Sequence, residues 1–268
     1  MMKGKSSVAM FIFIMFMVMS SSFEVTSQKL YKTTWKQSGF VFGGTAAMLG
    51  GAVLIEDRRG PLTVEDINSL DRETIFGIDQ GSVGNFSSRA GIDSDHFKNV
   101  AFVAPLALFF SGQARENTKE ILIMYAEVMA LNSGVTSICK SSFGRFRPYA
   151  YNPDVDLEIK LASTTRRSLF SGHVSHVASL SYFTATVFDD LYPESNYKYV
   201  VWAGAIAAPA ITGYLRVKAG RHFPTDVIIG YGVGALVGYF IPELHKITQD
   251  TNVDIIGAEG GLGLLYSF

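Results

Sequence analysis

The chain has 268 residues, of which 48% are apolar and 18% are charged, and its mean hydropathy is +0.21. Its 23 basic and 24 acidic residues give a formal charge of −1. This balance argues against a nucleic-acid partner, because proteins that bind nucleic acids normally carry a clear basic excess. The apolar content lies between that of an ordinary soluble protein and that of a multi-pass membrane protein.

Residues 1–28 are predicted to be an export signal. Lys3 and Lys5 supply a positive start, Val8–Met19 is an unbroken apolar run, and three serines at positions 20–22 supply small residues for cleavage. A run of 12 residues is short for a straight helix that crosses a bilayer. We therefore expect a cleaved signal rather than an anchor, and an exported protein of the periplasm or cell envelope.

Six apolar stretches of helical length follow, most of them rich in Gly, Ala and Ser, and no hairpin signal separates them. They predict an all-α fold, an antiparallel bundle of about six core helices. The stretches are Phe40–Ile55, Val100–Gly112, Ile121–Ile138, His173–Phe188, Tyr199–Leu215 and Val227–Ile241.

The polar region Glu56–Lys98 is predicted to be a long connection, with short helices at Val64–Leu70 and Ser87–Ile92. The expected divisions are thus a signal at 1–28, an N-terminal helix with its connection at 29–98, a core at 99–246 and a Gly-rich tail at 247–268. The tail has a strand-like end, and we expect it to have a structural role.

In the last apolar stretch, Gly230, Gly234 and Gly238 recur every four residues. This spacing places three bare backbone patches on one helix face, which predicts that another helix approaches closely there. The same pattern occurs in soluble and in membrane proteins.

Three short motifs carry groups that bind or attack phosphate, and all of them fall at predicted helix ends. In an antiparallel bundle these ends converge on one face. The motifs are K-x6-R-P (Lys140, Arg147, Pro148), S-G-H (Ser171, Gly172, His173) and R-x5-H-x3-D (Arg216, His222, Asp226).

The residue types of these motifs predict a site for a phosphoryl group. Arg147 and Arg216 offer planar charged forks that match phosphate oxygens, and Lys140 adds a compact positive charge. The free backbone N–H groups near Ser171 and Gly172, at the start of a helix, would form an anion site of their own. We interpret four flanking arginines as solvated or substrate-steering charges: Arg145, Arg166, Arg167 and Arg221.

Taken together, the motifs resemble the signature of the type 2 phosphatidic acid phosphatase superfamily, which also contains bacterial acid phosphatases and vanadium haloperoxidases. The resemblance covers about Lys119 to Lys246. Two positions depart from the usual pattern: Phe170 stands where the family generally has Pro, and Leu215 stands where Ser often precedes the Arg. Neither change removes a charged or nucleophilic group, so the departures concern the shape of the pocket and the substrate.

The resemblance implies a metal-independent phosphatase without a cofactor, in which His222 attacks phosphorus to give a phosphohistidine. Asp226, four residues on, would accept a hydrogen bond from the other ring nitrogen and orient His222. His173 would be the general acid and base. His176, one turn further, is interpreted as a satisfied core histidine.

The expected substrate is a phosphomonoester or a lipid (pyro)phosphate, such as phosphatidic acid or an isoprenyl pyrophosphate. Two alternatives stay open: a vanadium-dependent haloperoxidase, and a non-catalytic phosphate- or lipid-binding module on the same scaffold. The membrane question is also open. The short stretch Val100–Gly112, together with Glu127 and Asn132 inside Ile121–Ile138, favours a soluble or membrane-associated protein over a multi-pass one.

Overall fold

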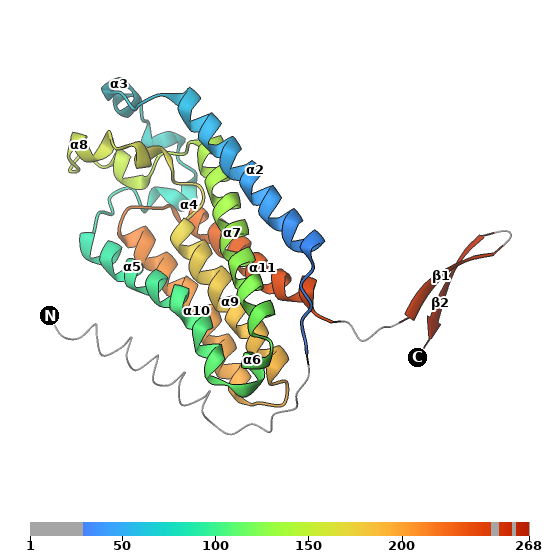
Figure 1. Ribbon diagram of the computed structural model, residues 1–268. Helices are drawn as coiled ribbons and strands as arrows, with labels where there is room; N and C mark the ends of the chain where they lie inside the picture. Colours follow the sequence, from blue (N-terminus) through green and yellow to red (C-terminus); the bar gives the residue numbers. More distant parts are fainter. Residues whose placement is uncertain (1–28, 248–251, 259–260, 268) are drawn as a thin grey trace.

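The computed structural model describes residues 29–247, 252–258 and 261–267, so the expected export signal lies outside it. Its main body is an antiparallel helical bundle (Figure 1). The described residues contain six helices of 16 or more residues, which confirms the predicted all-α bundle. These are α2 (Trp35–Arg59), α5 (Ser88–Val103), α7 (Thr118–Phe143), α9 (Gly172–Leu191), α10 (Tyr197–Lys218) and α11 (Pro224–His245).

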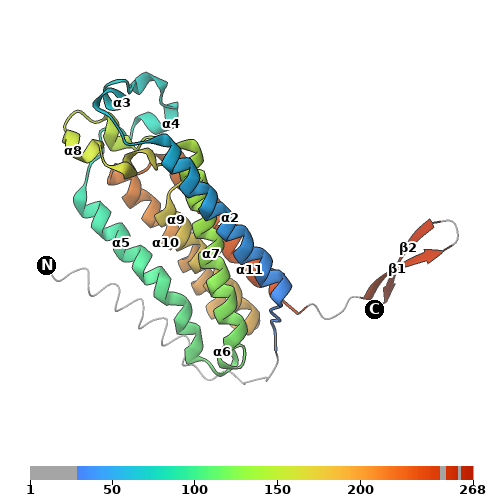
Figure 2. The same ribbon diagram turned by 45° about the horizontal axis from the view of Figure 1, so that its top comes forward.

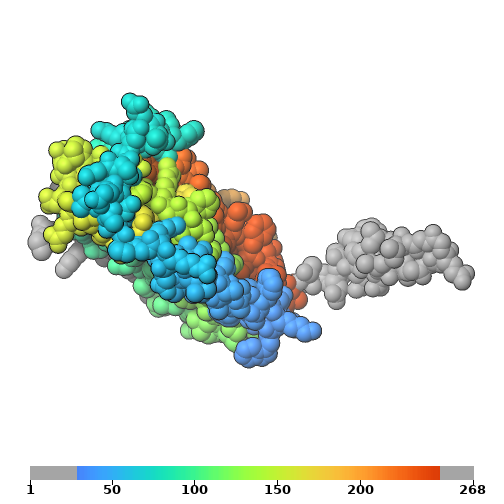
Figure 3. Space-filling model, turned by 90° about the horizontal axis from the view of Figure 1, so that it is seen from above, coloured from blue at the N-terminus to red at the C-terminus, as the bar shows by residue number. Residues whose placement is uncertain are grey.

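Short elements gather at the ends of the bundle. The helices α3, α4 and α8 lie at one end and α6 lies at the other (Figures 1 and 2). Viewed from above, the segments that carry α3, α4 and α8 lie over the end of the bundle (Figure 3). The short elements are α3 (Val64–Asn68), η1 (Arg72–Thr74), α4 (Gly77–Gln80), η2 (Ala104–Phe110), α6 (Gly112–Glu116), η3 (Pro148–Tyr151), α8 (Leu157–Lys160) and η4 (Ser163–Arg166).

The prediction of a core helix over Val100–Gly112 was wrong. The core helix in this region is α5, which begins earlier, at Ser88, because the Ser87 side chain caps it by accepting from the Ala90 amide. The chain leaves α5 at Val103 and continues as the 3₁₀ segment η2, with Pro105 in its first turn. Helix α5 therefore crosses the boundary expected at residue 98.

Helix α9 is the centre of the bundle and contacts α5, α7, α10 and α11. Its apolar side chains, such as Val177, Leu180 and Phe183, are fully buried. The glycine face of α11 packs directly on it, as predicted. A β-carbon added to each of these glycines would lie only 2.7, 2.2 and 2.1 Å from a serine carbonyl of α9, in the pairs Gly230–Ser171, Gly234–Ser175 and Gly238–Ser179.

Among the described residues, four helical segments are long and apolar enough to cross a membrane. They are α2, α10, α11 and the segment Thr118–Tyr151, which contains α7. Their outward faces expose large apolar side chains, among them Trp35, Phe40, Leu54, Ile206, Ile228 and Phe240. A broad apolar surface of this kind is typical of a protein that faces lipid. The structure therefore supports a membrane protein and not the soluble globule that the sequence favoured.

The two polar residues that argued against a span in α7 have partners inside the bundle. Glu127 Oε2 lies 2.6 Å from His245 Nε2, and both side chains are fully buried. Asn132 accepts a hydrogen bond from Ser175 of α9. Because both side chains are buried against partners in the protein, they do not face the apolar surroundings of the bundle.

The Gly-rich tail contains a two-stranded antiparallel hairpin. Strand β1 (Asn252–Ala258) pairs with β2 (Gly261–Ser267), with Asn252 opposite Ser267 and Ala258 opposite Gly261. The strand-like character of the tail thus corresponds to a hairpin, which the sequence analysis did not separate into two strands.

Candidate active site

Two turns with left-handed glycines carry the motif residues away from their helices. Gly144, at φ 55°, ends α7 just after Lys140 and redirects the chain toward Arg147. Gly220, at φ 66°, follows α10, and a β-carbon there would lie 1.9 Å from the Asn85 carbonyl. Because L-residues rarely adopt this backbone conformation, glycine at both positions fixes where the motif residues emerge.

The three predicted cations converge without carboxylate partners. Lys140 Nζ donates to the Arg167 carbonyl at 2.9 Å, and Arg216 donates to Ser94 Oγ at 3.2 Å. Within the part of the chain that the structure describes, none of Lys140, Arg147 and Arg216 forms an ion pair with a carboxylate. The Nε atoms of both arginines are shielded from solvent and lack a hydrogen-bond partner there. Clustered, unpaired cations of this kind are suited to holding an anion.

The start of α9 lies beside the cluster of Lys140, Arg147 and Arg216. Gly172 lets α9 approach α7, since a β-carbon there would lie 3.1 Å from Thr136 Cγ2 and 3.7 Å from Lys140 Cε. The Ser171 hydroxyl is buried and has no partner among the described residues. One expectation needs correction: the Ser171 amide is not free, because it donates to the Asp226 carbonyl at 3.0 Å. The amides of the following first turn remain available by helix geometry.

His222 is held as a neutral, directed imidazole. Its Nδ1 lies 2.8 Å from the Ser168 carbonyl, which can only accept, so Nδ1 carries the proton and Nε2 keeps its lone pair. The side chain is 1% exposed. Burial lowers the pKa of His222 well below its usual value, and the nearby positive charges of Lys140, Arg147 and Arg216 lower it further.

Asp226 does not make the expected direct hydrogen bond to His222. Its Oδ2 lies 3.8 Å from Nδ1 and instead accepts from Ser168 Oγ at 2.5 Å and from the Phe223 amide at 2.9 Å. The reason is its position in the first turn of α11, where the carboxylate caps the helix and turns toward the loop. Asp226 is therefore linked to His222 indirectly, through Ser168, whose carbonyl contacts the His222 ring, and through the amide of Phe223, the next residue in the chain.

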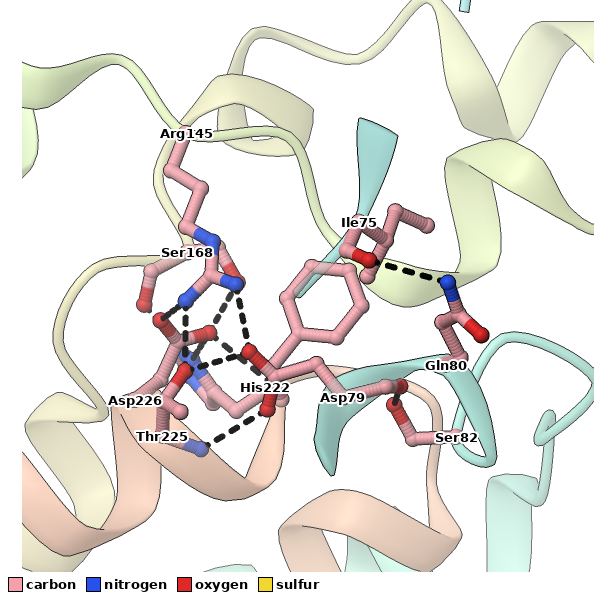
Figure 4. Close-up of polar contacts among 10 residues, drawn as sticks. Ile75, Asp79, Gln80, Ser82, Arg145, Ser168, His222, Thr225 and Asp226 are labelled. Carbon is pink, nitrogen blue, oxygen red and sulfur yellow. Dashed lines mark hydrogen bonds and ion pairs between the residues drawn. The ribbon is translucent and has the colours of Figure 1, made fainter. Parts of the chain in front are cut away.

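A second carboxylate and an arginine support Asp226 (Figure 4). Arg145 donates to Asp226 Oδ1 at 2.5 Å and to Asp79 Oδ2 at 2.7 Å. Asp79 is fully buried and also accepts from the amide and hydroxyl of Thr225, at 3.0 and 2.6 Å. Arg145 is thus a fixed part of this network, and its interpretation as a solvated or steering charge was wrong.

His173 lies on the more open side of the cluster, with 24% of its side chain exposed. Its Nε2 is 2.6 Å from Asp95 Oδ1 of α5. Burial and then the charge of Arg216 lower the pKa of His173 to about 3, while Asp95 opposes this shift. Ser94 and Asp95 were missed by the sequence analysis, and only the weak helical pattern at Ser87–Ile92 pointed to their helix.

His176 is satisfied, as expected for a core histidine. Its Nδ1 lies 2.7 Å from the Gly172 carbonyl and its Nε2 lies 3.2 Å from Ser133 Oγ. Phe170, at the position where the family generally has Pro, is 2% exposed and packs beside Gly230. Residues 29–247 and the two strands contain no group of three or more His, Cys, Asp or Glu side chains that could hold a metal ion.

Comparisons with known proteins agree with the motif resemblance. Residues 121–249 match the PAP2 superfamily. A lipid A 4'-phosphatase of Porphyromonas gingivalis is 29% identical over 150 residues, which are 53% of this chain and 60% of the relative. A lipid A 1-phosphatase of the same organism is 31% identical over 166 residues, 58% of this chain and 33% of the relative. The chain thus spans less than two thirds of the length of either relative.

Among solved structures, a transmembrane PAP2-type phosphatidylglycerolphosphate phosphatase from Bacillus subtilis is similar with a TM-score of 0.39. It is 20% identical, and the alignment covers 91% of this chain and 96% of that one.

Proposed function

Since residues 121–249 match the PAP2 superfamily, we propose that this protein is a membrane phosphatase that hydrolyses a lipid phosphate through a phosphohistidine on His222. The observation that carries the proposal is that one site combines unpaired cations with a neutral, oriented imidazole. Among the described residues, the three cations have no carboxylate partner, and the neutral imidazole of His222 beside them keeps one nitrogen free. Cations hold the phosphate, and the free nitrogen attacks it.

In the first step, His222 Nε2 forms a bond to phosphorus while the bond from phosphorus to the leaving oxygen breaks. The guanidinium groups of Arg147 and Arg216, with Lys140, the Ser171 hydroxyl and the first-turn amides of α9, hold the remaining oxygens and balance their charge. In the empty site, burial and the charge of Arg216 keep the pKa of His173 low, and the negative charge of the bound phosphate offsets this charge so that His173 is protonated in the complex. His173 then gives its proton to the leaving oxygen, so that an alcohol departs and not an alkoxide.

In the second step, water attacks the phosphohistidine. His173, now neutral, takes the proton from this water, the bond between phosphorus and nitrogen breaks, and inorganic phosphate leaves. His222 returns to its starting tautomer because the Ser168 carbonyl holds the Nδ1 proton throughout. The cationic side chains perform the charge balancing, so the scheme uses neither a metal ion nor a cofactor.

The substrate class is chosen from the surroundings of the site and from the two relatives. Within the described residues, four helical segments are long and apolar enough to cross a membrane and expose large apolar side chains, which favours a substrate anchored in the bilayer. Both matched Porphyromonas proteins are lipid A phosphatases. We therefore propose a phosphate monoester on a lipid headgroup, with lipid A as the first substrate to test.

The proposal is tested with purified protein and lipid phosphate in mixed detergent micelles. His222→Ala should lower phosphate release on the order of 10⁴-fold or more, because the nucleophile is lost. Brief incubation with ³²P-labelled substrate and acid-free quenching should label the wild-type chain with a base-stable, acid-labile phosphate.

The matched control is His96→Ala, which removes an exposed histidine of α5. It should keep full turnover and labelling, whereas His222→Ala should show neither at an unchanged thermal midpoint. Wild-type rates in His222→Ala, or label on a residue other than His222, would exclude the mechanism.

A further inference from the structure

We propose that Asp95 of α5 is the positioning residue for the general acid, holding the His173 ring so that it can protonate the leaving oxygen. This inference rests on the proposed phosphatase function and adds a fourth segment of the chain to its site. None of the three motifs contains Asp95. The contact between Asp95 Oδ1 and His173 Nε2, at 2.6 Å, is its starting observation.

Helix α5 is fixed where it meets the site. Ser94, the neighbour of Asp95, is fully buried; its hydroxyl donates to the Gly91 carbonyl at 2.6 Å and accepts from Arg216 at 3.2 Å. One turn of α5 therefore contacts both a phosphate-binding arginine and the general acid. This shared anchorage places Asp95 in a defined relation to the phosphate that Arg216 would hold.

The hydrogen bond decides what each ring nitrogen of His173 can do. An ionised carboxylate only accepts, so Nε2 donates to Asp95 and Nδ1 is left for the substrate. Proton transfer from Nδ1 then requires the charged imidazolium. Lys98 of α5 and Arg216 of α10 act against that charge, and Asp95 is the acidic side chain that favours it among the described residues that influence His173.

The two histidines differ in how far their side chains are exposed to solvent. His222 is 1% exposed, whereas His173 is 24% exposed and Asp95 is 52% exposed. An attacking group and a leaving group lie on opposite sides of phosphorus in an in-line displacement. The open side, with Asp95 and His173, is thus where a bulky alcohol has room to leave.

The test compares leaving groups. An alkyl phosphate needs its leaving oxygen protonated, whereas p-nitrophenolate departs with little help. For Asp95→Asn we expect a loss of roughly 10²-fold in kcat/KM on a lipid alkyl phosphate, but only about a twofold change in kcat/KM on p-nitrophenyl phosphate, because kcat/KM does not include the later hydrolysis of the phosphohistidine that both substrates share. Asp95→Glu should recover part of the loss. Asp93→Asn is the matched control, since Asp93 pairs with Arg89 on the same helix and is not in contact with His173.

A double-mutant cycle with His173→Asn completes the test. If Asp95 acts through His173, Asp95→Asn should add almost nothing to the loss already caused by His173→Asn. Equal losses on both substrates, additive losses in the cycle, or faster turnover in Asp95→Asn would overturn the role of Asp95. A wild-type protein that hydrolyses neither substrate would instead overturn the proposed function.

Discussion

The two ends of the bundle differ in the pairing of their cations, although the site end also holds the paired cluster of Arg145, Asp79 and Asp226. At the end away from the site, Glu127 pairs with His245 at 2.6 Å, and Asp190 binds both Lys246 and the Tyr31 hydroxyl. At the site end, Lys140, Arg147 and Arg216 have no such partners among the residues that the structure describes.

Whether a charged side chain is paired indicates whether it serves stability or ligand binding. A charge removed from water is costly unless it is paired, so pairing at one end is what stability alone requires. Leaving three cations together without carboxylates does not stabilise the empty protein. Under the proposed function, a phosphorylated ligand supplies the missing negative charge, and the following substitutions test this contrast.

The largest effect is expected at the unpaired end. Arg147→Ala should lower kcat/KM by roughly 10²- to 10³-fold, because a donor to the transferring phosphoryl group is lost. The thermal midpoint of the substrate-free protein should not fall, since a repelling charge is removed as well. The control is Arg115→Ala, near the other end, which should leave kcat/KM unchanged. A destabilised Arg147→Ala with normal kcat/KM would make Arg147 a structural cation.

The paired end should show the reverse behaviour. Glu127→Ala leaves the buried His245 ring without its partner and should cost about 2–3 kcal/mol of folding free energy. Turnover per folded molecule should stay at the wild-type value. Thermal unfolding in detergent and active-site titration measure the two quantities. The comparison between the ends fails if Glu127→Ala loses turnover while keeping its stability.

A smaller effect is expected between the ends, where α9 and α11 touch. Gly234→Ala places a methyl group 2.2 Å from the Ser175 carbonyl and should cost about 2 kcal/mol, with some loss of activity as the two helices separate. Gly232→Ala is the matched control, because a β-carbon there meets nothing within 4 Å. It should be neutral or stabilising by about 0.5–1 kcal/mol. Similar stabilities of the two variants would argue against the close packing.

Much of the fold was predictable because the apolar periodicity and the glycine spacing report helix packing directly. Helices α2, α7, α9, α10 and α11 lie where the apolar stretches predicted them. Helix α5 was only partly recognised, because its buried positions are Ala90, Ser94 and Ala101 and its pattern is not that of an apolar stretch.

The motif residues could be recognised in the sequence because their chemistry and spacing are unusual. The residues that hold them in place could not be recognised. Ser168 holds His222 through a main-chain carbonyl, which no side-chain pattern reveals. The i, i+4 spacing of His222 and Asp226 predicted a direct contact, but capping of α11 turns the carboxylate away. Arg145 could not be told apart in sequence from the other loop arginines, and its partner Asp79 is 66 residues away in sequence.

Ser168 commits every polar group it has: its amide to the Arg145 carbonyl, its carbonyl to His222, and its hydroxyl to Asp226. The orientation of His222, the proposed nucleophile, is therefore set by one anchored residue in the segment between α7 and α9. The outer part of that segment, residues 152–162, holds neither the nucleophile nor a motif cation. If the proposed function holds, new sequence grafted into this outer part would leave the contact between Ser168 and His222 in place, so the entrance to the site could change while the imidazole keeps its tautomer.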